Sequence, residues 1–415
     1  MSQTIHLKER KPLKGKPLLW ALTIVYFASY MTRVNLAAII QEVVTDTGFE
    51  KSTLSIVLIC LSTAYGLGQI INGRLGDKFK PQNMIFVGSI LTTTVNLIFP
   101  LFSQSVLSMA ILWGINGFAQ AMMWPPIVRI MVANFEGEEY GSAQIFISWG
   151  TSLATILVYL IAPILILISG WKTVLLFCGS VGVCGCIWWA FQRGRVSVEI
   201  QPDPNEALPE KQQKMHFPSF ALFPIILIAL GVMCQGMLRD GVTAWMPSYL
   251  AEVFKFGNSS AIFCTVILAI FSGIAFTIVG AIYKKWFKNE VFCACFVFLT
   301  AALCSLTLFF FFEGGGAILA IAMMALITGC MHGVNLMLVS HVPKRFRKYG
   351  NISTISGTIN ACSHVGAAIF TYGIALLSEK IGWRWTVGVW FIIAILGATV
   401  CLVGAKLWKK MTEEE

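Results

Sequence analysis

Charged residues are scarce in this sequence. They make up 12% of its 415 residues, whereas hydrophobic residues make up 57%. Soluble globular domains carry roughly 25% charged residues, about twice this share. A chain with so little charge cannot cover a water-facing surface. This excludes a soluble protein and predicts a membrane protein with many spanning segments.

Several kinds of functional motif are also missing. The sequence has no group of His, Cys, Asp and Glu at metal-ligand spacing, no nucleophile triad and no glycine-rich nucleotide loop. We therefore expect no metal, no cofactor and no enzymatic activity. The twelve cysteines all fall in apolar stretches, where thiols act as packing residues and stay reduced.

Long apolar runs dominate what is present. A membrane-spanning helix needs about 20 apolar residues, and such runs lie at 18–41, 53–75, 84–102, 106–132, 143–168, 171–191, 220–250, 259–283, 290–312, 316–341, 352–377 and 383–405. A polar segment at 192–219, rich in proline, glutamine and charge, separates six runs from six and is expected to be a solvated linker. The expected fold is an all-α membrane protein of twelve transmembrane helices. Its six-helix bundles lie at 18–191 and 220–405, between tails at 1–17 and 406–415.

Basic residues are distributed unevenly between the two sides of the expected bundle. If both termini are cytoplasmic, the cytoplasmic segments hold 23 of the 30 Lys and Arg residues and the outer loops hold 5. An excess of basic residues on the cytoplasmic side is the rule for membrane proteins. We therefore predict a cytoplasmic-membrane protein with both termini inside. This distribution explains the net charge of +10 without a nucleic-acid partner.

The two remaining basic residues lie inside apolar runs. They are Arg33 and Arg239, which are 206 residues apart, about half the chain. An arginine buried in a membrane is energetically costly and marks a functional site. Because the two occupy matching places in the two halves, they predict a central site for a small anion.

Short motifs repeat between the halves. Gly170–Lys172 (Gly-Trp-Lys) opens the sixth run, and Gly382–Arg384 (Gly-Trp-Arg) opens the twelfth, 212 residues later. Similarly, Tyr140–Ser142 and Tyr349–Asn351 are offset by 209 residues. Together with the arginine offset, these motifs indicate a parallel six-helix repeat.

Polar residues near Arg33 in sequence or depth are candidate ligands. Tyr30 and Asn35 flank it in the first run. Tyr65 and Gln69 lie one helical turn apart in the second run, and so on one helix face. We expect all four to line the anion site, although a packing role is the plain alternative.

Three titratable residues are candidates for a proton site. Asp240 is adjacent to Arg239, so its side chain leaves the helix about 100° away and is expected to be a poor partner for that arginine. His332 and His364 lie deep in the tenth and eleventh runs. A lone histidine in a helix bundle is more often a packing residue, so a role for either in substrate or proton binding is the alternative.

The loop after the second run, Gly73–Pro81 (GRLGDKFKP), resembles the G-x-x-x-D-[RK] loop of major facilitator transporters. Gly73 permits close helix contact, and Asp77 requires a cation or a helix N-terminus as partner. The corresponding segment of the second half, Gly280–Lys288, has lysines but no Asp. We expect that half of the gate to be degenerate.

The cytoplasmic end of the fourth run is expected to complete this inner gate. Arg129 is predicted to pair with Asp77 or with one of three nearby carboxylates, Glu136, Glu138 and Glu139. Trp124–Pro126 is predicted to kink the run, because proline cannot continue a regular helix.

Three stretches resemble the organophosphate:phosphate antiporter family. They are YMTRVN (30–35), WPPIVRIM (124–131) and LRDGVTAWMPSYL (238–250). The resemblance implies a major facilitator fold, with the substrate phosphate held by Arg33 and Arg239. It also implies exchange of a phosphate ester for inorganic phosphate by alternating access. We further expect a monomer in a bacterial membrane.

The sequence departs from this family at two positions. Gln69 stands where the family's phosphate transporters carry a lysine, and Thr151 takes the place of a substrate-binding histidine. The site is therefore less basic than theirs, which leaves room for a less charged organic anion.

Two other functions remain open. Arg33–Leu36 is similar to the R-x-N-L element of anion:cation symporters, which implies a proton-coupled symporter of a sugar acid or another organic carboxylate. A transporter-like sensor of a phosphate ester is a minor alternative, although nothing in the sequence adds a signalling domain.

Overall fold

The computed structural model describes residues 12–49, 51–198, 222–256, 264–312, 315–349 and 351–413, and all regular elements within them are helical. The first half contains α1 (Gly15–Thr47), α2 (Lys51–Lys78), α3 (Pro81–Ile98), α4 (Val106–Gln120), α5 (Trp124–Asn134), α6 (Gly137–Ser169) and α7 (Lys172–Gln192). The second half contains α8 (Leu222–Phe254), α10 (Val266–Trp286), α11 (Glu290–Phe310), α12 (Gly316–Asn335) and α13 (Ile352–Glu413). Most of the predicted linker and N-terminal tail lies outside the described residues.

The helices account for the twelve predicted spans. Eleven segments of the described chain are long and apolar enough to cross a membrane. The remaining predicted run, the eleventh (352–377), is the first part of α13, which Gly382 (φ 78°, ψ 167°) separates from the twelfth run and last span. Only glycine adopts this backbone conformation readily. The predicted all-α fold of twelve helices is confirmed.

The fourth run is broken, as its prolines predict. Helix α4 ends at Gln120, and α5 begins at Trp124 with proline in its first turn. Proline has no N–H to donate and clashes with the preceding turn, but it fits the start of a helix. The chain therefore restarts as a new helix at Trp124.

A tryptophan clamp appears once in each half. Trp171 Nε1 donates to Asp46 Oδ2 (2.9 Å), and Trp383 Nε1 donates to Glu252 Oε2 (2.6 Å). The two carboxylates are 206 residues apart, the same offset that separates the buried arginines. Each clamp joins the end of the first helix of a half to the start of its last membrane span. The contacts agree with the repeat seen in the sequence.

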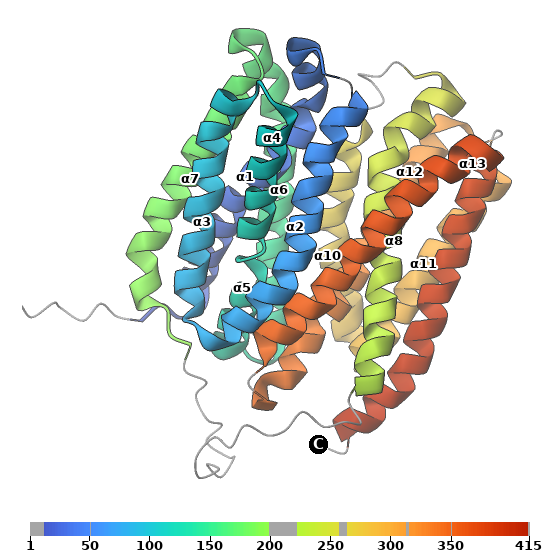
Figure 1. Cartoon of the computed structure of the whole chain (residues 1–415). Coiled ribbons are helices and arrows are strands. Elements are labelled where there is room, and N and C mark those ends of the chain that lie inside the picture. The colour runs from blue at the N-terminus through green and yellow to red at the C-terminus, as the bar shows by residue number, and fades with distance from the viewer. Residues whose placement is uncertain are drawn as a thin grey trace, which may run out of the picture.

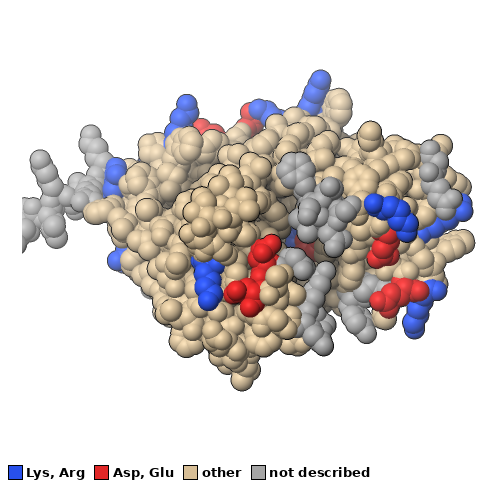
Figure 2. Space-filling view, turned by 90° about the horizontal axis from the view of Figure 1, so that it is seen from above, with Lys and Arg blue, Asp and Glu red and all other residues tan. Residues whose placement is uncertain are grey.

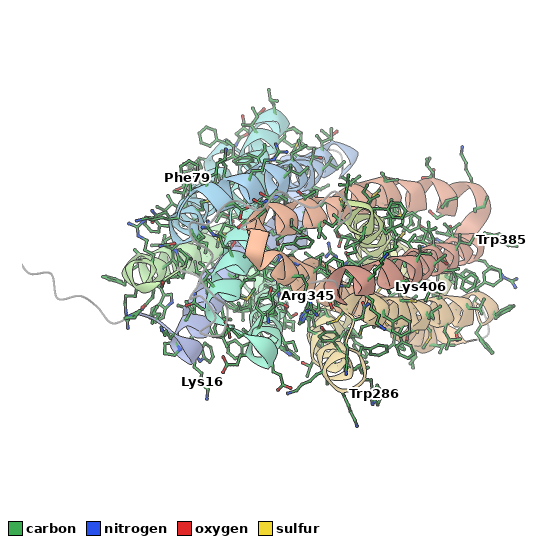
Figure 3. The ribbon with its side chains drawn as sticks, turned by 90° about the horizontal axis from the view of Figure 1, so that it is seen from below. Lys16, Phe79, Trp286, Arg345, Trp385 and Lys406 are labelled. Carbon is green, nitrogen blue, oxygen red and sulfur yellow. The ribbon has the colours of Figure 1, made fainter. Side chains whose placement is uncertain are left out.

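Both described ends of the chain lie on one face of the bundle, the lower face in Figure 1, which we call the termini side. Figure 3, viewed from below, shows Lys16, Arg345 and Lys406 on this side. The opposite face is seen in Figure 2, where charged side chains are scattered over a mostly uncharged surface.

Candidate functional site

A cavity of about 310 Å³ lies between the two halves of the bundle. Helices α1, α2, α5 and α6 contribute one wall, and α8, α10, α12 and α13 contribute the other. Most of the predicted site residues line it, namely Arg33, Arg239, Tyr30, Tyr65, Thr151, Asp240, His332 and His364. The cavity therefore brings together residues that are far apart in the sequence.

Arg33 is held against two tyrosine rings. Its guanidinium carbon lies 4.0 Å from the centre of the Tyr65 ring and 5.3 Å from that of Tyr30. Such cation–π contacts orient a guanidinium without neutralising its charge. The Tyr65 hydroxyl accepts a hydrogen bond from Asn360 Nδ2 (3.4 Å), and its ring packs edge-on against His364. The arginine of the first half is thus supported by a tyrosine that touches the second half.

Arg239 makes a bidentate ion pair with its neighbour in sequence. Its Nε lies 2.6 Å from Asp240 Oδ1, and its Nη2 lies 3.0 Å from Oδ2. The prediction that Asp240 is a poor partner was wrong. The two side chains leave the helix in different directions, but the long arginine side chain reaches back around it. Since Nη1 takes no part in the pair, one edge of the guanidinium remains for a ligand.

The two arginines therefore differ in charge compensation. Among the described residues, the ion pairs are Arg239–Asp240, Lys284–Glu138 and Arg345–Glu290. Arg33 belongs to none of these pairs. With the histidines neutral, the charged groups lining the cavity sum to one net positive charge.

Helix α6 presents a row of hydroxyls to the cavity. Ser148, Thr151, Ser152 and Thr155 all line it, and only Thr151 was predicted. Ser152 also meets Ser272 of the second half, with 3.1 Å between the hydroxyl oxygens. The spacing of three and four residues places such side chains on one helix face. This polar stripe in an apolar run was the signal that sequence reasoning missed.

Two predicted ligands lie elsewhere. Asn35 is buried within the first half, where its Nδ2 donates to Asn96 Oδ1 (2.6 Å). Gln69 is buried where α2 meets α13, where its backbone carbonyl oxygen would lie 2.2 Å from a Cβ at Gly357, and its side chain does not line the cavity. Gln69 shares a helix face with Tyr65, but one turn further on that face meets another helix and not the cavity. Both predictions are therefore corrected.

Asp77 joins the halves on the termini side. Its carboxylate accepts hydrogen bonds from the backbone N–H groups of Ser353 (2.9 Å) and Thr354 (2.8 Å), in the first turn of α13. A negative charge at a helix N-terminus is stabilised by unpaired N–H groups and the helix dipole. Gly73 makes this approach possible, because a Cβ there would lie 2.8 Å from the Ser353 carbonyl oxygen. The predicted helix-N-terminal partner of Asp77 is confirmed.

Arg129 has a different partner from the one predicted. Its Nη1 donates to the backbone carbonyls of Gly76 and Phe79, the latter at 3.1 Å. It forms no ion pair with Asp77 or another carboxylate among the residues that the structure describes. The carbonyls at a helix C-terminus are unpaired and carry partial negative charge, so they suit the cation. Arg129 therefore caps the end of α2.

The second half has a charge-reversed counterpart to the contact that Asp77 makes between the halves. Lys284 stands 207 residues after Asp77, and its Nζ lies 2.5 Å from Glu138 Oε2, in the first turn of α6. The prediction of a degenerate half is corrected, since a lysine and a glutamate span the same kind of junction. Both side chains are well exposed, 60% and 71%, so this pair adds little stability.

Replacing Asp77 by asparagine is expected to slow transport about tenfold while changing equilibrium ligand affinity less than threefold. Asparagine keeps a hydrogen-bond acceptor but loses the charge, which contributes about 1 kcal/mol at a helix N-terminus. The change acts on the balance between conformations and leaves the cavity intact. Uptake in vesicles and binding in detergent measure the two effects.

Glu139→Gln is the matched control, because this exposed carboxylate lies in the first turn of α6, next to Glu138 and on the same side of the molecule. A collapse of binding affinity in Asp77→Asn, with accessibility of the two sides to thiol reagents unchanged, would show that Asp77 is not a gate residue.

Known proteins resemble this chain in sequence and in fold. The glycerol-3-phosphate transporter of Bacillus subtilis (strain 168) is 24% identical over 389 residues, which cover 86% of this chain and 85% of that protein. A probable hexose phosphate transport protein of Chlamydia pneumoniae is 27% identical over 176 residues, which cover 40% of this chain and only 38% of that protein.

The fold agrees with a solved membrane transporter. A bacterial homologue of the iron transporter ferroportin, solved in its outward-facing state, superposes with a TM-score of 0.75. The superposition covers 94% of this chain and 99% of that one at 10% identity, so it shows the fold alone. The sequence profile of the Major Facilitator Superfamily matches residues 22–371. With this match over most of its length, the chain belongs to the Major Facilitator Superfamily.

Proposed function

We propose that this protein carries a phosphate ester across the cytoplasmic membrane in exchange for inorganic phosphate. The observation that carries the proposal is the pair of arginines, Arg33 and Arg239, lining one cavity between the halves. Guanidinium groups donate paired N–H bonds that match the spacing of phosphate oxygens, and they stay protonated at any physiological pH. A site built from two of them selects a small oxyanion.

The rest of the cavity suits a hydroxylated carbon skeleton. The α6 hydroxyls stand on one wall, and Thr243, Ser272 and Asn335 lie on the other. Tyr26 and Trp124, stacked at 5.5 Å, provide an aromatic surface beside them. Hydroxyl and amide groups pair with substrate hydroxyls, and a volume of about 310 Å³ holds a small sugar or polyol phosphate. The names of the similar transporters support the same class of substrate.

The contacts between the halves support alternating access with a central site. In this conformation Asp77 and Lys284 both bridge the halves on the termini side. Tyr140 adds a third bridge, because its hydroxyl donates to the Ser340 carbonyl (2.7 Å). If the termini are cytoplasmic, as the basic residues predict, the route to the cytoplasm is closed and substrate enters from outside.

Uncompensated charge favours exchange over one-way movement. Arg33 has no carboxylate within ion-pair distance among the described residues. Closing an empty cavity around this guanidinium leaves a charge in a low-dielectric interior, which is costly. An anion removes that cost, so the loaded carrier changes conformation more readily than the empty one.

A second candidate function is proton-coupled symport of an organic carboxylate. The observation that favours it is Asp240, a carboxylate in the cavity wall near His332 and His364. A group that binds and releases protons beside the substrate is what such coupling requires.

Counterflow tests the proposal. Purified protein is placed in liposomes loaded with inorganic phosphate, and uptake of labelled glycerol-3-phosphate, hexose 6-phosphate and a sugar acid is compared. We expect phosphate esters to accumulate and the sugar acid to stay outside, with protein-free liposomes as the control. Uptake of the sugar acid without that of any phosphate ester would overturn the proposal.

A further inference from the structure

We propose that Asp240 sets the charge of the oxyanion that the cavity accepts, so that the native site prefers a singly charged anion to a doubly charged one. The inference rests on the proposed function in one respect: the ligand is an oxyanion held between Arg33 and Arg239. It adds that a phosphate ester binds as its monoanion, a form that is populated near neutral pH because the second pKa of such esters is about 6.

The Asp240 carboxylate lies close enough to the expected ligand for its charge to affect binding. Asp240 lines the same cavity as the two arginines and holds Arg239 through Nε and Nη2 at 2.6 and 3.0 Å. Its side chain is 36% exposed, so it is not shut away behind the arginine. An anion on the remaining edge of the guanidinium therefore lies within a few ångströms of a negative charge.

The charged groups that line the cavity determine which ligand charge they can neutralise. Arg33 from α1 and Arg239 from α8 are positive, and Asp240 is negative. His332 from α12 and His364 from α13 also face the cavity, and an ordinary imidazole is neutral at pH 8. The net charge is then +1. A monoanion brings it to zero, whereas a dianion leaves one uncompensated negative charge in the middle of the membrane.

Removing the carboxylate therefore changes the affinities for monoanions and dianions by different amounts. Coulomb energy is proportional to the ligand's charge, so Asp240→Asn lowers the binding free energy of a dianion by twice the amount for a monoanion. The fold increase in affinity for the dianion is therefore about the square of the fold increase for the monoanion. Asparagine has nearly the same shape and keeps an acceptor for Arg239 Nε, so the arginine stays in place.

The test uses probes whose charge does not change with pH. Inorganic sulfate carries two charges and 2-hydroxyethanesulfonate carries one. Binding of each to the full-length protein in detergent is measured by calorimetry at pH 8. For Asp240→Asn we expect about a threefold gain in affinity for the sulfonate and about a tenfold gain for sulfate. Sulfate binding that is detectable only in the variant supports the inference equally.

Glu252→Gln is the matched control. It removes a carboxylate from the same helix, but Glu252 binds Trp383 and does not line the cavity. We expect its ratio of sulfate to sulfonate affinity to equal that of the native protein, and thermal unfolding checks that both variants are folded.

Three results would overturn the inference. Weaker binding of both probes in Asp240→Asn would mean that Asp240 only positions Arg239. Equal gains for both probes would mean that it does not discriminate by charge. No binding of either probe to either protein would mean that the cavity is not an oxyanion site. Failure of phosphate counterflow with the charge preference intact would instead remove only the proposed phosphate-ester exchange.

Discussion

Replacing Arg33 or Arg239 by alanine is expected to reduce transport at least about 100-fold. Each change removes a guanidinium from the cavity that both arginines line, and loss of one partner from a buried charge-assisted pair costs about 3 kcal/mol or more. Arginine-to-lysine changes are also expected to fail substantially, because an ammonium is a point charge without the bidentate fork. Uptake of labelled substrate into vesicles, normalised to the amount of folded protein, is the measurement.

The two arginines require different precautions. Arg33 lies on tyrosine rings, so its removal leaves no carboxylate unpaired. Removing Arg239 leaves Asp240 without its ion pair, which destabilises a protein when the charge is buried. Arg239→Ala is therefore compared with the double variant that also carries Asp240→Asn. We expect the double variant to fold better and still not transport.

Arg384→Ala is the matched control for these variants. This arginine lies over the Phe309 ring, 5.3 Å from its centre, and does not line the cavity. We expect it to keep near-native transport. Near-native transport in Arg33→Lys or Arg239→Lys would contradict direct binding of the oxyanion by the guanidinium groups.

The features that the sequence predicts well are those with a local energetic signal. A run of about 20 apolar residues has few alternatives to a spanning helix, and an arginine inside such a run is too costly to be incidental. Arg33 and Arg239 were found in this way, and the structure places both in one cavity. Asp77 was predicted to need a cation or a helix N-terminus, and it meets the N-terminus of α13.

The features that sequence reasoning missed depend on which neighbour a helix face meets. The pattern puts Tyr65 and Gln69 on one face of α2, but it does not say that this face lines the cavity at Tyr65 and touches α13 at Gln69. Helix periodicity likewise gives the direction in which a side chain leaves the helix, but not the position of the far end of a long side chain. The Arg239–Asp240 pair was missed for this reason.

The Lys284–Glu138 pair was not predicted for a related reason. Lys284 and Glu138 are far apart in the sequence, and each is ordinary for a loop or a helix end. The repeat offset points to the position in the second half that corresponds to Asp77, but that position holds a lysine and not an aspartate. A junction between two helix ends accepts either arrangement of charges, so the position repeats while the residue type does not.

Exchange is expected to depend on internal anion and not on a proton gradient. Arg33 and Arg239 keep their charge at every accessible pH, so a carrier that relies on them alone has no obligatory proton site. Vesicles loaded with inorganic phosphate should therefore accumulate a labelled phosphate ester well above the level of empty vesicles, by about tenfold or more if empty carriers rarely change conformation. This ratio follows from the cost of closing the cavity around uncompensated charge.

The decisive experiment varies internal phosphate and the proton gradient independently. Vesicles are either loaded with phosphate or left empty, and each set is assayed with and without an inward proton gradient, with a protonophore as the control for the gradient. In an exchanger, internal phosphate drives accumulation, and pH acts only through the protonation of the substrate. In a symporter, the gradient drives accumulation into empty vesicles, and a titrating group in the cavity wall is essential. Asp240, His332 and His364 are the candidates among the described lining residues. Gradient-driven accumulation in empty vesicles, abolished by Asp240→Asn and preserved in Glu252→Gln, would replace exchange by proton symport of an organic anion.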